Sequence, residues 1–182
     1  HIYVGSYLSL AALTFLPTIF FIFYKNTSKI ELSFKYSGRS YLELVSQPRF
    51  LQAVISSAFG YAIMTFLMTG TPLSMHVIEG ISLNKTSIVI QIHVACMFLP
   101  SLIAGNLVKR IGHSKMMYVG VGLYCITVVI SLFDQSFLNY MLALVFLGFG
   151  WNFLFISGTS LLVLTYKAVS YTHLRAHETR VH

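Results

Sequence analysis

Polar side chains deep inside long apolar segments are the residues of this chain best placed to do chemistry. In chain order they are Tyr61, Thr65, Gln91, His93, Trp151, Asn152 and Thr159. A polar group in an apolar medium is unfavourable unless it is hydrogen-bonded, so each must bond to a neighbouring helix, to water or to a bound solute. The chemistry these residues support is noncovalent binding of a solute, with proton transfer added at His93.

The first two residues, Tyr61 and Thr65, lie near mid-depth in the segment from Phe50 to Met75. At helical spacing they share a face with Ser57, Met64 and Met68. Hydroxyl groups in such segments also bond back to their own helix or to a neighbour, and this structural interpretation stays open beside solute binding. Near the far end of the segment, Gly70-Thr71-Pro72 predicts a break, either a gating hinge or a plain helix end.

Gln91 and His93 lie in the segment from Thr86 to Val108, about 200° apart on a helix. They therefore face different neighbours. An imidazole can gain or lose a proton near neutral pH, so His93 is a candidate proton relay, and a neutral ring bonded to an adjacent helix is the alternative.

The segment from Phe137 to Tyr166 is the richest in small and polar residues. Gly148, Asn152, Phe155 and Thr159 fall on one helical face. Asn152 could bind solute or join two helices, and Trp151 could stack on a flat solute or pack internally.

Five apolar segments must position these residues, each long enough to cross a bilayer and free of Asp, Glu, Lys and Arg. They are Ile2 to Phe23, Phe50 to Met75, Thr86 to Val108, Met116 to Phe133 and Phe137 to Tyr166. The basic residues of residues 1–167 fall in connections on one side, with the exception of Lys85. Connections rich in Lys and Arg mark the cytoplasmic face of a membrane protein. We therefore expect a multi-pass protein of a bacterial inner membrane, with His1 outside and Lys167 in the cytoplasm.

Composition agrees with membrane residence. The chain is 56% hydrophobic and 9% charged, whereas soluble domains average about 25% charged residues. Its net charge of +7 belongs to loops beside anionic headgroups, which argues against nucleic acid as a partner. The two cysteines lie inside apolar segments, and we expect no disulfide, metal site or organic cofactor.

The predicted organisation has four parts. Residues 1–24 form one helix, 25–49 a cytoplasmic linker with a short surface helix near its end, and 50–167 four further helices. Residues 168–182 carry no apolar period, and 168–179 resemble the translation of a sequencing-library adapter. We therefore expect a non-native tail on an incomplete chain.

The linker, the segment SQPRFLQAVISSAFGYAIMTFLMTGTP and the turn GNLVKRIGHSK together resemble transporters of the major facilitator superfamily. Gly105, Arg110, Gly112 and Lys115 fit the family's loop motif, while Lys109 stands where an Asp is usual and His113 where an Arg is usual. In physical terms, we expect Gly105 to allow close helix approach and Gly112 to allow the chain reversal.

The resemblance implies an all-α bundle holding helices six to ten of a twelve-helix transporter. It implies alternating access for a small solute, with a coupling proton as a further candidate and the remaining helices of the same chain as partners. Two alternatives remain. A membrane enzyme would need clustered acid or base residues, but the carboxylates are scattered over different connections. A channel or non-transporting scaffold would be distinguished by ion-selective currents in place of saturable solute flux.

Overall fold

The computed structural model describes residues 4–23 and 45–178, with side-chain surroundings in the second range as far as Thr165. The elements are α1 (Val4–Phe23), α3 (Pro48–Leu73), the π-helical turn η1 (Ser74–Ile78), α4 (Leu83–Phe98), α5 (Ser101–Ile111), α6 (His113–Ser131) and α7 (Phe137–Glu178). The described residues form helices and turns without a strand, which confirms the predicted all-α class. Residues 1–37 and 38–182 form separate units, so α1 is described by itself.

Three described helical stretches are long and apolar enough to cross a membrane, namely Pro48–Ile78, His113–Ser131 and Phe137–Thr165. A fourth is the pair α4 and α5, which meet at a bend of 43°. In α1 the apolar helix found among described residues is Val4–Phe15, shorter than a full span. Four of the five predicted spans therefore have counterparts, and the span from Ile2 to Phe23 stays a prediction.

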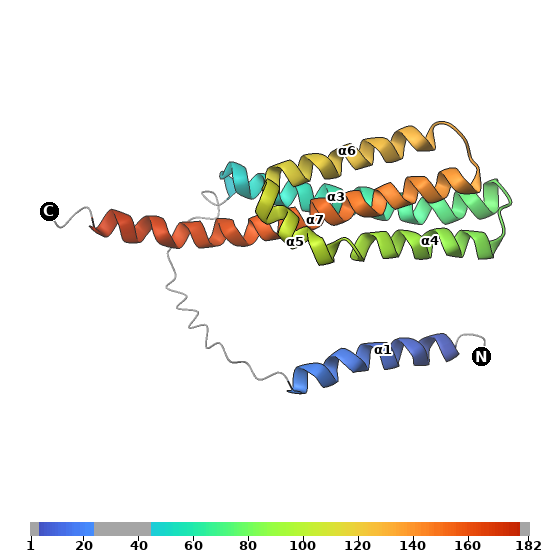
Figure 1. Ribbon diagram of the computed structural model, residues 1–182, viewed down its shortest axis with the longest axis horizontal. Coiled ribbons are helices and arrows are strands. Elements are labelled where there is room, and N and C mark those ends of the chain that lie inside the picture. Colours follow the sequence, from blue (N-terminus) through green and yellow to red (C-terminus); the bar gives the residue numbers. More distant parts are fainter. Residues whose placement is uncertain (1–3, 24–44, 179–182) are drawn as a thin grey trace. The chain divides into compact units, whose positions relative to one another are not determined.

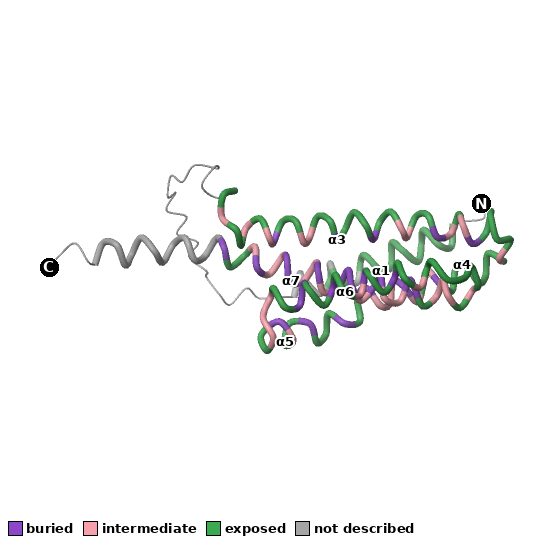
Figure 2. Tube along the Cα trace, turned by 90° about the horizontal axis from the view of Figure 1, so that it is seen from above, coloured by how far each residue is buried: buried purple, intermediate pink, exposed green. Residues whose placement is uncertain are grey.

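Helix α7 is the centre of the second unit (Figure 1). In its apolar stretch 56% of residues are buried, against 17% in the stretch that contains α3 and 28% in α6. Chain order makes α3 and α6 antiparallel to α7 and α4 parallel to it. Figure 2 shows exposed positions dominating α3, with buried residues recurring along it, among them Ala53, Gly60, Met64 and Thr71.

Small residues on α7 let its neighbours approach closely. A Cβ on Gly150 would lie 2.6 Å from Tyr124 Cδ1, and one on Gly148 would lie 2.9 Å from the His93 carbonyl oxygen. Such contacts are typical of membrane helix pairs. Among the described residues nothing lies within 4 Å of a Cβ built on Gly105, so the close approach expected there stays a prediction.

The α-helix ends beside the break predicted at Gly70-Thr71-Pro72. Helix α3 continues through Pro72 to Leu73, and the turn η1 follows it directly. The wider turn is closed by the Glu79 amide, which donates to the Ser74 carbonyl at 3.0 Å. A π-helical turn has one extra residue per turn, and here it extends the helical backbone from Leu73 to Ile78.

A real interruption lies in the third predicted span, which the structure divides between α4 and α5. Pro100 follows Leu99, and it has no N–H to donate back along the helix. The span predicted from Thr86 to Val108 therefore consists of two helices. The residues on either side stay helical, so the segment bends and continues.

Two helix starts agree with the sequence. Pro48 occupies the first turn of α3, where its missing N–H is tolerated, and Gly112 has φ +86°, which permits the reversal between α5 and α6. The backbone of α7 continues beyond the predicted limit at Tyr166 to Glu178. The expected surface helix, in the linker before Pro48, lies almost entirely outside the described residues.

Candidate solute-binding site

Asn152 is a buried polar residue of α7 that forms two hydrogen bonds to a neighbouring segment. It is 1% exposed, and its Nδ2 donates to the carbonyl of Met97 at 2.6 Å and to the hydroxyl of Ser101 at 2.7 Å. Both partners come from the α4–α5 segment, one on each side of the bend. Asn152 therefore joins α7 to this segment where its helix is interrupted.

The interruption explains why an amide is needed there. Backbone bonds near the bend run from Leu99 to Ala95 and from Ala104 to Pro100, and those recorded for the described residues between α4 and α5 do not use the Met97 carbonyl. A buried carbonyl without a donor is unfavourable. Asn152 supplies that donor from the neighbouring helix.

His93 lies on α4 about one turn before Met97 and is fully buried. Its Nδ1 lies 2.8 Å from the carbonyl oxygen of Leu144 on α7. Because a carbonyl oxygen only accepts, Nδ1 must carry the proton, and in a neutral ring Nε2 is then an acceptor. This tautomer follows from the chemistry of the partner.

Trp151 belongs to an aromatic cluster. Its ring stacks on Phe155 with centroids 5.0 Å apart and meets the edge of Phe98 at 6.0 Å. One face of the indole is thus already covered by a residue of its own helix.

We call His93, Ser101, Trp151 and Asn152 the polar cluster of the α4–α7 interface. Three of its atoms are buried without a hydrogen-bond partner among the described residues: His93 Nε2, Trp151 Nε1 and Asn152 Oδ1. They comprise two acceptors and one donor, which suits a polar organic molecule. No three metal-binding side chains gather within the described ranges, so the cluster offers hydrogen bonding and stacking.

The other predicted binding residues lie apart from this cluster. Tyr61 and Thr65 are exposed on α3, although Met64 between them is buried. Gln91 is exposed on α4, and Thr159 Oγ1 donates to Phe155 of its own helix at 2.7 Å. The structure thus places His93, Trp151 and Asn152 along the α4–α7 interface, and it does not place the remaining four there.

The four residues of the loop motif surround the turn between α5 and α6. Gly105, Arg110 and Lys115 are exposed, and Gly112 forms the turn itself. They lie at the end of the bundle opposite Lys85, as the charge pattern requires.

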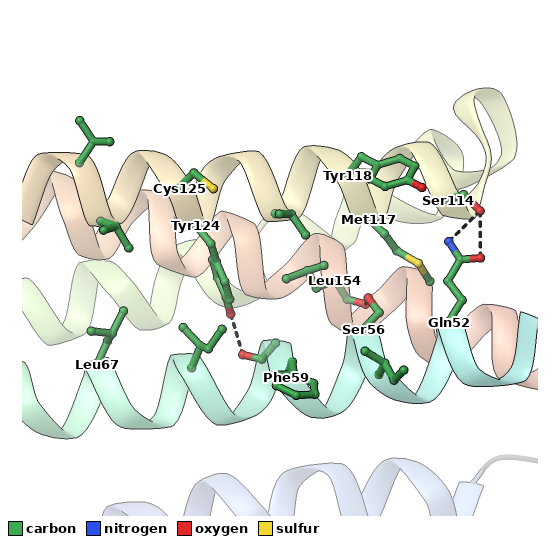
Figure 3. Close-up of a pocket in the computed structure, with 16 residues that line it drawn as sticks. Gln52, Ser56, Phe59, Leu67, Ser114, Met117, Tyr118, Tyr124, Cys125 and Leu154 are labelled. Carbon is green, nitrogen blue, oxygen red and sulfur yellow. Dashed lines mark hydrogen bonds between the residues drawn. The ribbon is translucent and has the colours of Figure 1, made fainter. Parts of the chain in front are cut away.

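A cavity of about 940 Å³ lies elsewhere, between α3 and α6, and Leu154 of α7 lines it (Figure 3). Its walls are mainly apolar, and two of its polar side chains are already bonded: Tyr124 donates to the Gly60 carbonyl at 2.6 Å, and Gln52 bonds Ser114. None of the predicted solute-binding residues lines it. We do not assign it to the solute.

Sequence reasoning missed Pro100, Ser101 and Tyr124. A proline inside an apolar run is a recognisable signal of a kink, and it would have pointed to the bend that Asn152 bridges. The bond from Tyr124 to Gly60 depends on which helices become neighbours, and no local pattern carries that information.

The geometry is that of a polytopic α-helical membrane protein with a polar site in its interior. Sequence comparison with known proteins finds transporters. Over 161 residues, 87% of its length, the chain is 36% identical to a riboflavin transporter, RfnT, of Brucella anthropi, and it spans 40% of that protein. It is also 39% identical over 103 and 104 residues to two uncharacterized MFS-type transporters of Bacillus subtilis, YdeG and YddS, spanning 24% and 23% of them. No protein-family profile matches the chain, and no solved structure does. The predicted resemblance is confirmed: the chain is homologous to part of transporters of the major facilitator superfamily.

Proposed function

We propose that this chain is part of a secondary active transporter that moves a small organic solute across the cell membrane by alternating access. The observation that carries the proposal is the 36% identity to a named transporter over 87% of the chain. Because the chain spans less than half of that relative, the activity is assigned to the full-length transporter. The remaining helices of that protein complete the solute cavity.

The polar cluster is the central part of the proposed solute site. Trp151 Nε1 donates to the solute, and Asn152 Oδ1 accepts from it once the two halves move apart. Tyr61, Thr65, Gln91 and Thr159 complete the set from the faces of α3, α4 and α7. Because RfnT is a riboflavin transporter by name, a flat heteroaromatic solute is the first class to test, with riboflavin as its first member.

Proton coupling is assigned to His93. Its Nδ1–H is held by Leu144, so Nε2 is the atom that takes and releases a proton.

The end of the bundle that holds Arg49, Arg110 and Lys115 is assigned to the cytoplasm of a bacterial cell by the positive-inside rule, with His1 outside and Lys167 inside. Transport of this kind needs no metal or organic cofactor, and transporter relatives point away from an enzyme.

A channel or a non-transporting scaffold is the second candidate, and the test separates it. Cells expressing the full-length gene are assayed for initial uptake of labelled riboflavin and then of other heteroaromatic solutes, with rates normalised to protein in the membrane. We expect saturable uptake that Asn152→Ala and Tyr61→Phe lower more than they lower membrane abundance. Non-saturable flux, or ion currents without solute uptake, would contradict the proposal. Normalised uptake and apparent affinity equal to wild type in both variants would reject the site assignment alone.

A further inference from the structure

A second cavity, of about 450 Å³, lies at the end of the bundle where α3 and α6 begin. Two cationic side chains line it, Arg49 from the first turn of α3 and Lys115 from the first turn of α6, together with the imidazole of His113. The motif analysis placed Lys115 in a loop, but it did not anticipate a cavity shared with Arg49. No predicted solute-binding residue lines this cavity.

The positive charge of this cavity has no nearby acid in the part of the chain that the structure describes. Two carboxylates lie in the range whose side-chain surroundings are described: Glu79, which follows the far end of α3, and Asp134, which follows the far end of α6. Both therefore lie one membrane thickness away. An anion from outside the described residues is the natural counter-charge.

Two helix starts add to the positive potential. α3 has 26 residues and α6 has 19, and neither has a side-chain cap at its first residue. The positive ends of the two helix dipoles meet at the same cavity. Gln52 and Ser114 line both this cavity and the one between α3 and α6, and their hydrogen bond of 3.0 Å links the two helices (Figure 3 shows the pair).

The position of the cavity selects the kind of anion. Arg49 is the second residue of one apolar stretch, His113 the first of another and Thr165 the last of a third, so the cavity lies where the hydrocarbon ends. Leu161 and the half-exposed Leu164 add an apolar wall beside the basic groups. An anionic head joined to apolar chains satisfies both parts.

We infer that this cavity binds the phosphate group of an anionic phospholipid at the membrane surface. Arg49 and Lys115 contact the phosphate oxygens, and the acyl chains extend along Leu161 and Leu164. The site is separate from the polar cluster of the α4–α7 interface, and it does not depend on which solute is carried.

The test measures lipid binding to the purified full-length transporter by native mass spectrometry, with phosphatidylglycerol and phosphatidylcholine offered separately. We expect a preference for phosphatidylglycerol that falls about 5-fold in Lys115→Gln and about 25-fold in Arg49→Gln/Lys115→Gln, from the energy of one basic residue near a charged surface. Arg49→Lys/Lys115→Arg keeps the charge and should keep the preference. The single Lys115→Gln variant serves if the double variant does not fold.

The matched controls lie outside the cavity. Lys109→Gln/Arg110→Gln removes two charges from the same end of the bundle, and Lys85→Gln removes one from the other end. Lys85→Gln should leave the preference within about 2-fold of wild type, because its charge lies at the other end of the bundle and is screened. Lys109→Gln/Arg110→Gln should lower the preference less than Arg49→Gln/Lys115→Gln does, because neither side chain lines the cavity. An equal loss in the Lys109→Gln/Arg110→Gln variant would overturn the site. Binding of inorganic phosphate without a preference for phosphatidylglycerol would overturn the lipid as its source.

Discussion

Replacing Asn152 by alanine removes the link between α7 and the bend in α4–α5. The variant loses the donor to the Met97 carbonyl and the donor to Ser101. Hydrogen bonds between membrane helices average about 0.6 kcal/mol, so two give about 1 kcal/mol. The Met97 carbonyl is left buried without its partner, which raises the upper limit to about 3 kcal/mol. We therefore expect Asn152→Ala to lower the free energy of unfolding by about 1–3 kcal/mol.

The assay is reversible unfolding of the full-length transporter in a lipid-like environment, with Asn106→Ala as the matched control. Asn106 is an exposed asparagine on α5, so its loss should change stability by less than about 0.5 kcal/mol. Asn152→Asp keeps the shape but, when ionised, cannot donate, and it should be at least as destabilising as Asn152→Ala. If Asn152→Ala and Asn106→Ala are equally stable, the proposed link across the bend does not exist.

Four further predictions follow from the packing, the bend, the charge pattern and the tail. Gly150→Ala places a Cβ 2.6 Å from Tyr124 Cδ1 and should destabilise by about 1–3 kcal/mol, whereas Gly122→Ala, with nothing within 4 Å, should be neutral or slightly stabilising; equal thermal stability of the two would refute the close packing. Pro100→Ala restores an N–H and should reduce the 43° bend, measured as a longer spin-label distance between Ser87 and Asn106; an unchanged distance would show that the proline does not cause it. Cysteines at Lys35 and Lys115, in a background without Cys96 and Cys125, should resist an impermeant reagent in intact cells, and efficient labelling of both would reverse the topology. Sequencing of an independent clone, made without the adapter, should show different codons from Ala168 onward. Recovery of the same fifteen codons would show that the tail is native.

The membrane-spanning architecture could be predicted because apolar length and charge are local properties of a sequence. Burial of Asn152 and His93 also followed, since a polar residue within an apolar run needs a partner. Which partner it finds could not be predicted. The Met97 carbonyl becomes available because the bend after Pro100 separates it from the Ser101 amide, its helical partner, and Asn152 lies on a different helix. The face of α3 that meets α7 holds Gly60 and Ser56, whose hydroxyl donates to the Leu154 carbonyl at 3.3 Å.

Solute counterflow in proteoliposomes tests the transporter assignment most directly. Vesicles containing the purified full-length protein are loaded with unlabelled riboflavin and diluted into a trace of labelled riboflavin, with other heteroaromatic solutes run in parallel. An alternating-access carrier exchanges the two pools, so label should accumulate transiently inside and do so less in Asn152→Ala vesicles with the same protein content. Absence of exchange for every solute tried, together with ion conductance across the same membranes, would contradict the account.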